Sequence, residues 1–196
     1  MSSNQQRLYQ IAESQQGYFT YRQALQCGYT SPTHGYHVGT GAWIRERRGI
    51  YRLARFPAAA DGHYVLWTLW SCNRDGVAQG VYSHQTALSI HELADVMPAK
   101  LHMAVPLRFR RTAVIPKVLV LHKTDLPPVD VEWRQGYRVA RPLRAIADLL
   151  RDETESRDRL QQALAGGLRR GLIARTELER HPSRKMLEEL LKGKLT

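Results

Sequence analysis

Two carboxylates and an arginine alternate over a segment with strand-like composition: Asp130, Glu132 and Arg134. Because alternate residues of a strand point to the same face, we expect these three side chains to lie together. Paired carboxylates can hold a divalent cation, as metal-dependent nucleases require. Such nucleases also use a lysine, and its place is taken here by an arginine, which is a poor proton acceptor. A solvent-exposed strand face is therefore favoured, with a metal-dependent nuclease as the alternative.

The histidines give weaker indications of chemistry. His34 and His37 have no acidic or thiol residue beside them in the sequence. His84 and His91 would lie two helical turns apart, too far to share a metal ion without another ligand. Ser83 lacks the Gly-x-Ser-x-Gly frame of a hydrolase and is predicted to cap a helix instead. We expect no catalytic residue, no metal site and no cofactor.

Positive charge is the strongest indication of function. Among 196 residues, 29 are Lys or Arg and 18 are Asp or Glu, which gives a formal net charge of +11. Residues 1–57 and 100–123 are strongly basic, whereas the intervening residues 58–99 carry a net negative charge. Two separate basic patches are predicted, and such patches favour a polyanionic partner, since bound cations release counterions from phosphates.

The second basic block is expected to contact flanking DNA or an acidic protein. Its cations are Arg108, Arg110, Arg111 and Lys117. Phe109, which lies among them, is expected to anchor the loop to the core.

The elements that must position the first basic block are predicted to be three helices followed by a hairpin. Thr20 is expected to cap the second helix and Ser31, followed by Pro32, the third. The helices are expected over 5–14, over 21–27 and from residue 31, and the strands over 43–44 and 50–53, joined by a turn over 45–49. This is the order of a winged helix-turn-helix.

In such a domain the second helix of the pair enters the major groove, and the hairpin, or wing, meets phosphates or the minor groove. The residues expected to contact DNA are Arg22, Ser31, Thr33, His34, Tyr36, His37, Arg45, Arg47, Arg48 and Arg52. The apolar hairpin residues Trp43, Ile50, Tyr51 and Leu53 are expected in the core.

A Pro-Ala joint after Phe56 predicts a domain boundary. The fold class is therefore α+β: a winged helix-turn-helix over residues 1–57, then an α+β domain over 58–196 with a helical C-terminal tail. The second domain is expected to contain helices from Asp61, Ser83 and Pro142, strands over 101–105 and 118–121, and a hairpin over 131–139 that turns at Gln135. The strand over 118–121 is expected to be buried.

Cellular location follows from what the sequence lacks. Cys27 and Cys72 are too few for a disulfide framework, the N-terminal residues are polar, and no apolar run approaches the ~18 residues of a membrane span. We expect a cytoplasmic protein with no membrane partner.

Three segments resemble the AbiEi-type antitoxin and transcriptional regulator family. They occur in the order expected for that family: GYFTYRQALQCGYTSPTHGYHVGTGAWIRERRGIYRL (17–53), YSHQTALSIHELADVMPAKLHMAVP (82–106) and VARPLRAIADLL (139–150). The recognition helix of the family usually carries several arginines, whereas residues 31–40 carry none and have two histidines instead.

The resemblance implies a two-domain antitoxin of a bacterial type IV toxin–antitoxin pair, the AbiE system. Its N-terminal domain would bind repeats in the double-stranded DNA of its own promoter and repress the operon. Its C-terminal domain would neutralise a nucleotidyltransferase-like toxin, in this family often without a stable complex. A transcriptional regulator unrelated to any toxin is the nearest alternative.

Overall fold

The computed structural model describes residues 3–93 and 98–193 of an α+β protein, which divides into two compact units. The first unit comprises Met1–Gly80 and Trp133–Arg138, and the second comprises Val81–Glu132 and Val139–Thr196. The first unit reaches beyond the predicted boundary at residue 57, because helix α4 (Gly62–Trp70) packs against two strands of the N-terminal sheet.

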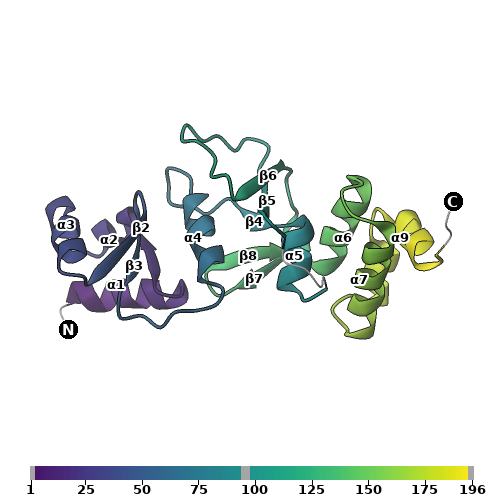
Figure 1. Ribbon diagram of the computed structural model, residues 1–196, viewed down its shortest axis with the longest axis horizontal. Helices are drawn as coiled ribbons and strands as arrows, with labels where there is room; N and C mark the ends of the chain where they lie inside the picture. Colours follow the sequence, from purple (N-terminus) through teal and green to yellow (C-terminus); the bar gives the residue numbers. More distant parts are fainter. Residues whose placement is uncertain (1–2, 94–97, 194–196) are drawn as a thin grey trace. The chain divides into compact units, whose positions relative to one another are not determined.

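The first unit begins with three helices and a three-stranded antiparallel sheet (Figure 1). These elements are α1 (Ser3–Ser14), β1 (Tyr18–Thr20), α2 (Tyr21–Gln26), α3 (Ser31–Gly39), β2 (Trp43–Arg47) and β3 (Ile50–Leu53). Strand β3 lies between β1 and β2. This order and pairing are consistent with a winged helix-turn-helix.

Local hydrogen bonds fix the starts of α2 and α3. Thr20 caps α2 as predicted: its hydroxyl accepts the Gln23 N–H at 3.2 Å, and the Gln23 side chain accepts the Thr20 N–H at 2.7 Å. The cap predicted for α3 was wrong by one residue. Thr30 is the N-cap, Ser31 is already helical, and the Thr33 hydroxyl accepts the Thr30 N–H at 3.0 Å.

The first hairpin strand, β2, is longer than predicted, whereas β3 has the predicted bounds. Arg45 and Arg47 belong to β2, which leaves Arg48 and Gly49 as the turn. Gly49 has φ of +76°, a conformation that side chains rarely adopt. The core beneath the hairpin contains the buried residues Leu8, Ala12, Phe19, Ala24, Cys27, Trp43 and Tyr51.

The second unit is built around a five-stranded mixed sheet with the order β6-β5-β4-β8-β7. The tip of the β7–β8 hairpin, Trp133–Arg138, belongs to the first unit. Strand β4 is antiparallel to β5 and parallel to β8, and β5 is parallel to β6. The elements up to the hairpin are β4 (Val81–Tyr82), α5 (His84–Ile90), β5 (Leu101–Val105), β6 (Leu119–Lys123), the 3-10 helix η1 (Pro128–Asp130), β7 (Val131–Arg134) and β8 (Tyr137–Ala140).

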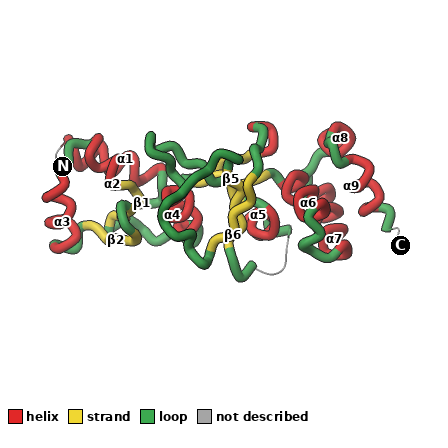
Figure 2. Tube along the Cα trace, turned by 90° about the horizontal axis from the view of Figure 1, so that it is seen from above, coloured by secondary structure: helices red, strands yellow, loops and turns green. Residues whose placement is uncertain are grey.

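The chain after β8 is helical, as predicted (Figure 2). It forms α6 (Pro142–Arg151), α7 (Arg157–Arg169), α8 (Arg175–Arg180) and α9 (Arg184–Leu191). Helix α6 packs between α5 and α7 and buries eight of its ten residues, so it forms much of the core of this unit. Within residues 3–93 and 98–193, no helix combines the length and apolar character needed to cross a bilayer.

Three expectations for the second unit were wrong in detail. Strand β6 is an edge strand, so Val120 and Leu121 are only half-buried. Asp130 ends η1 and does not share a strand with Glu132. Ser83 is the N-cap residue of α5 as predicted, but its hydroxyl contacts the ring of His84 and makes no capping hydrogen bond. The segment over 82–106 includes residues 94–97, which lie outside the described residues.

Candidate nucleic-acid interface

Helix α3 is held on the domain by the ring of His34. This side chain is only 4% exposed, and its ring centroid lies 4.5 Å from that of Tyr21, 5.3 Å from Trp43 and 5.7 Å from Tyr51. Burial, together with the neighbouring His37, lowers the pKa of His34. The expectation that His34 faces a base edge does not fit this position, because the ring packs inside the domain.

Two other predicted contact residues of α3 also support the helix. The His37 ring is half-buried and stacks on Trp43, with 4.6 Å between centroids and 22° between planes. The Thr33 hydroxyl bonds to the backbone of Thr30. Ser31 and Tyr36 are the two members of the predicted set on this helix that are exposed, Tyr36 to 67%.

The four predicted hairpin arginines differ in their surroundings. Arg45 and Arg48 are exposed and have no ion pair within the part of the chain that is described. Arg47 is exposed as well, with its guanidinium 4.7 Å from the centroid of the Trp67 ring. Arg52 donates to the Glu46 carboxylate at 2.9 Å, so its charge is balanced within the hairpin. Arg45 and Arg48 are therefore the cations most available to a phosphate.

Arg22 lies on the exposed side of α2, where its guanidinium donates to the carbonyl of Arg74. It still presents positive charge to solvent, although part of its hydrogen-bonding capacity is used within the unit.

The second basic block forms the loop between β5 and β6. Arg108, Arg110, Arg111 and Lys117 are exposed, and Phe109 is only 5% exposed, so it anchors the loop as expected. An acid lies near the start of this loop, since the Asp125 carboxylate accepts the Leu107 N–H at 3.3 Å.

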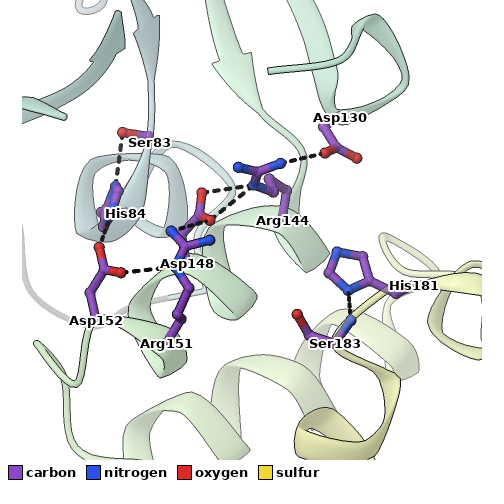
Figure 3. Close-up of polar contacts among 9 residues, drawn as sticks. All are labelled: Ser83, His84, Asp130, Arg144, Asp148, Arg151, Asp152, His181 and Ser183. Atoms are coloured by element: carbon purple, nitrogen blue, oxygen red, sulfur yellow. Dashed lines mark hydrogen bonds and ion pairs between the residues drawn. The ribbon is translucent and has the colours of Figure 1, made fainter. Parts of the chain in front are cut away.

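The three candidate nuclease residues are not brought together as a cation site. Asp130 accepts from Arg144 at 2.9 Å (Figure 3), and the same arginine donates to both oxygens of Asp148 at 2.9 and 3.0 Å. Asp148 is 1% exposed, so this arrangement compensates a buried carboxylate. Among the described residues, the group with suitable metal-ligand spacing includes neither Asp130 nor Glu132.

Sequence reasoning missed the residues that position α3. Tyr29 lies between α2 and α3, and its ring is 5.0 Å from Trp43 and 5.3 Å from His37. Tyr21 covers His34 from the start of α2. The sequence did contain an indication of this cluster. Two tyrosines and two histidines lie around the predicted turn, and this composition is typical of an aromatic cluster in a small core.

Comparison with known proteins gives both a family match and a fold similarity. The chain resembles the crystal structure of the RV2827C protein from Mycobacterium tuberculosis, with a TM-score of 0.51 and 14% identity over all of this chain and 83% of that one. At this identity the similarity concerns the fold alone. Comparison with curated proteins found no match.

The family match covers the N-terminal part of the first unit. It includes most of α1 and all of the elements from β1 to β3, about a quarter of the chain. The other two segments that resemble the family, residues 82–106 and 139–150, lie outside the matched residues. Residues 6–54 match the model of the family described as "Transcriptional regulator, AbiEi antitoxin", which confirms the predicted family resemblance for this part of the chain.

Proposed function

We propose that this chain is a DNA-binding antitoxin that represses transcription of its own toxin–antitoxin operon. Residues 1–57 would bind repeats in the promoter, and residues 58–196 would neutralise a nucleotidyltransferase-like toxin. The family match over residues 6–54 supports a regulator of a toxin–antitoxin system in general terms. The promoter, the toxin and the division of roles between the two parts are our proposal.

The observation that carries the DNA-binding proposal is the pair of uncompensated arginines on the hairpin. Arg45 is exposed on β2 and Arg48 is exposed at the turn, while Trp43 of the same hairpin packs against α3. Wing cations of this kind bind phosphates and fix the register of a protein on DNA. Arg22 and Arg47 would add to this charge.

Helix α3 would supply the contacts to bases. Ser31 and Tyr36 present hydroxyl groups that can donate to or accept from base edges. Since α3 has no arginine, we expect phosphate contacts by the wing to supply most of the affinity, and a few hydroxyl contacts to supply the sequence preference. His34, His37 and Thr33 would act indirectly by holding α3 in place.

The loop with Arg108, Arg110, Arg111 and Lys117 is our candidate for the contact with an acidic partner surface or with flanking DNA. Four exposed cations on one loop form a concentrated positive charge. Such a charge increases the rate of encounter with an acidic partner, even where the resulting complex is short-lived. This agrees with neutralisation that needs no stable complex.

The wing is tested by Arg45→Ala with Arg48→Ala. The control is Arg157→Ala with Lys185→Ala, which removes the same charge from exposed helical positions of the second unit. Affinity for the DNA upstream of the gene is measured by fluorescence anisotropy at several salt concentrations. Because each phosphate contact contributes about 0.9 to the slope of log K against log salt, we expect the wing variant to lose about 1.8 from that slope. Equal slopes in the wing and control variants would remove the wing from the interface.

The antitoxin role is tested by co-expressing the full chain with the neighbouring gene and measuring growth. We expect wild type and the wing variant to restore growth equally, while only wild type represses a promoter fusion. No rescue by wild type would refute the antitoxin role, and loss of rescue in the wing variant would refute the separation of the two roles.

A further inference from the structure

Three histidines and an aspartate from different elements converge in the second unit. His84 begins α5, His102 lies in β5, His122 lies in β6, and Asp152 follows the last residue of α6. One potential ligand atom from each of His84, His122 and Asp152 lies within 4.8 Å of the other two. These four residues are far apart in the sequence, and their spacing does not indicate that they meet. The cluster is therefore apparent only in the folded structure.

The side chains face one another closely. His84 Nε2 is 3.1 Å from Asp152 Oδ2 (Figure 3), and the rings of His84 and His122 stack with 3.6 Å between their centroids. His102 Nδ1 is 3.0 Å from His122 Nε2. The other oxygen of Asp152 accepts from Arg151 at 3.1 Å, which leaves Oδ2 directed toward the histidines.

These distances suit a metal ion. Zinc binds imidazole nitrogen and carboxylate oxygen at about 2.0–2.2 Å in a tetrahedron, so its ligand atoms lie about 3.4 Å apart. The three potential ligand atoms lie within 4.8 Å of one another, and one of the two stacked rings would turn so that both direct a nitrogen at the same ion.

The surroundings of the cluster also resemble those of a metal site. Ligating histidines usually bond through their second nitrogen to a neighbouring group that fixes the ring. The Ser83 hydroxyl is 3.0 Å from His84 Nδ1, on the opposite side of the ring from Asp152. His84 also has φ of +51°, a strained conformation that persists mainly where the surrounding structure requires it.

A hydrolytic triad of Ser83, His84 and Asp152 explains the cluster less well. Ser83 is fully buried, so its hydroxyl cannot meet a substrate. The triad also gives no role to His122, whose ring lies against His84.

We propose that His84, His122 and Asp152 bind one Zn²⁺ ion, with Ser83 and His102 orienting the two ligating rings. Three protein ligands leave a fourth position for water or for a group from a partner. The ion would connect the start of α5, the edge strand β6 and the end of α6. This inference does not depend on DNA binding.

The test measures zinc binding by the full chain after treatment with a chelator. ZnCl₂ is titrated in competition with a chromophoric chelator, and thermal unfolding is recorded with and without zinc. We expect one equivalent of zinc to bind and to raise Tm, because a ligand that binds only the folded state stabilises it. His122→Gln and Asp152→Asn alter side chains that are not fully buried, and each should weaken zinc binding at least about tenfold.

The control is His63→Gln, which removes an exposed histidine outside the cluster and should leave zinc binding unchanged. Circular dichroism confirms that each variant is folded. Absence of stoichiometric zinc binding by wild type would overturn the proposal. Undiminished binding in the folded variant that combines His122→Gln with Asp152→Asn would overturn it too. Promoter affinity, measured separately, tests the proposed function and is expected to be the same in these variants.

Discussion

His34 provides a direct test of whether this residue reads DNA or only holds α3. Its ring is buried among Tyr21, Trp43 and Tyr51, and neither ring nitrogen has a hydrogen-bond partner among the described residues. Replacement by Phe keeps an aromatic ring in this position and removes both nitrogens. We therefore expect His34→Phe to fold and to bind promoter DNA with wild-type affinity.

The energetic consequences follow from burial and packing. His34→Ala removes a buried ring and leaves a cavity, which costs about 2–3 kcal/mol. In His34→Phe, relief of unpaired buried nitrogens, about 1–3 kcal/mol, opposes the cost of a larger ring, also about 1–3 kcal/mol. The free energy of unfolding should therefore change by less than about 2 kcal/mol, measured by urea denaturation.

The dependence of stability on pH separates the contribution of His34 from that of the other histidines. Burial lowers the pKa of His34 in the folded state below its value of about 6.5 in the unfolded state. Below pH 6.5 the unfolded state therefore binds more protons, and the folded state loses stability as pH falls, by at most about 1.4 kcal/mol per pH unit. We expect this part of the acid sensitivity to be absent from His34→Phe, so its stability should exceed that of wild type increasingly below pH 6.5.

The reasoning would be refuted by a His34→Phe protein of wild-type stability that has lost specific DNA binding. That result would mean that a ring nitrogen contacts a base. An identical pH dependence in wild type and His34→Phe would contradict the assigned pKa shift.

Three further substitutions test the packing of the two units, each by urea or thermal denaturation. Arg144→Ala leaves the buried carboxylate of Asp148 with Arg151 as its remaining ion pair and should destabilise the second unit by about 1–3 kcal/mol, whereas Lys185→Ala should change little. Gly136→Ala places a methyl group 2.9 Å from Val65 Cγ2 at φ of +86°, and should cost more than about 1 kcal/mol; an unchanged midpoint would contradict the hairpin geometry. Thr20→Ala removes the hydroxyl of the α2 cap and should cost about 1 kcal/mol, whereas Thr20→Ser should retain most of it.

The N-terminal elements could be predicted because local chemistry determines them. Thr20 and Gln23 form a capping box, and the apolar residues Ile50 and Tyr51 begin a strand in which both are buried. The cap of α3 was misplaced by one residue, since Thr30 and Ser31 are both good capping residues and only the structure shows which one has extended backbone.

The role of individual site residues was harder to predict because burial depends on contacts distant in sequence. His34 has the composition of a DNA-contacting residue, but Trp43 and Tyr51 enclose it from the hairpin. Likewise, nothing in the sequence pairs Asp130 with Arg144, which meet only when η1 and α6 pack together.

The histidine cluster shows the same limit most clearly. His84 and Asp152 are separated by 68 residues, yet their side chains are 3.1 Å apart. His122 was overlooked because β6 was expected to be a buried apolar strand, whereas its position at the edge of the sheet brings His122 beside α5. Fold topology, and not local spacing, brings these residues together.

The central claim is that this chain binds specifically to the DNA upstream of its own gene. The most direct measurement is an anisotropy titration with that DNA at two salt concentrations, with and without an excess of scrambled competitor. The account predicts tight binding that survives the competitor and weakens with salt without vanishing, since hydroxyl contacts from α3 add to the phosphate contacts of the wing. Binding that the scrambled DNA removes equally well, and that disappears at the higher salt, would contradict specific autorepression.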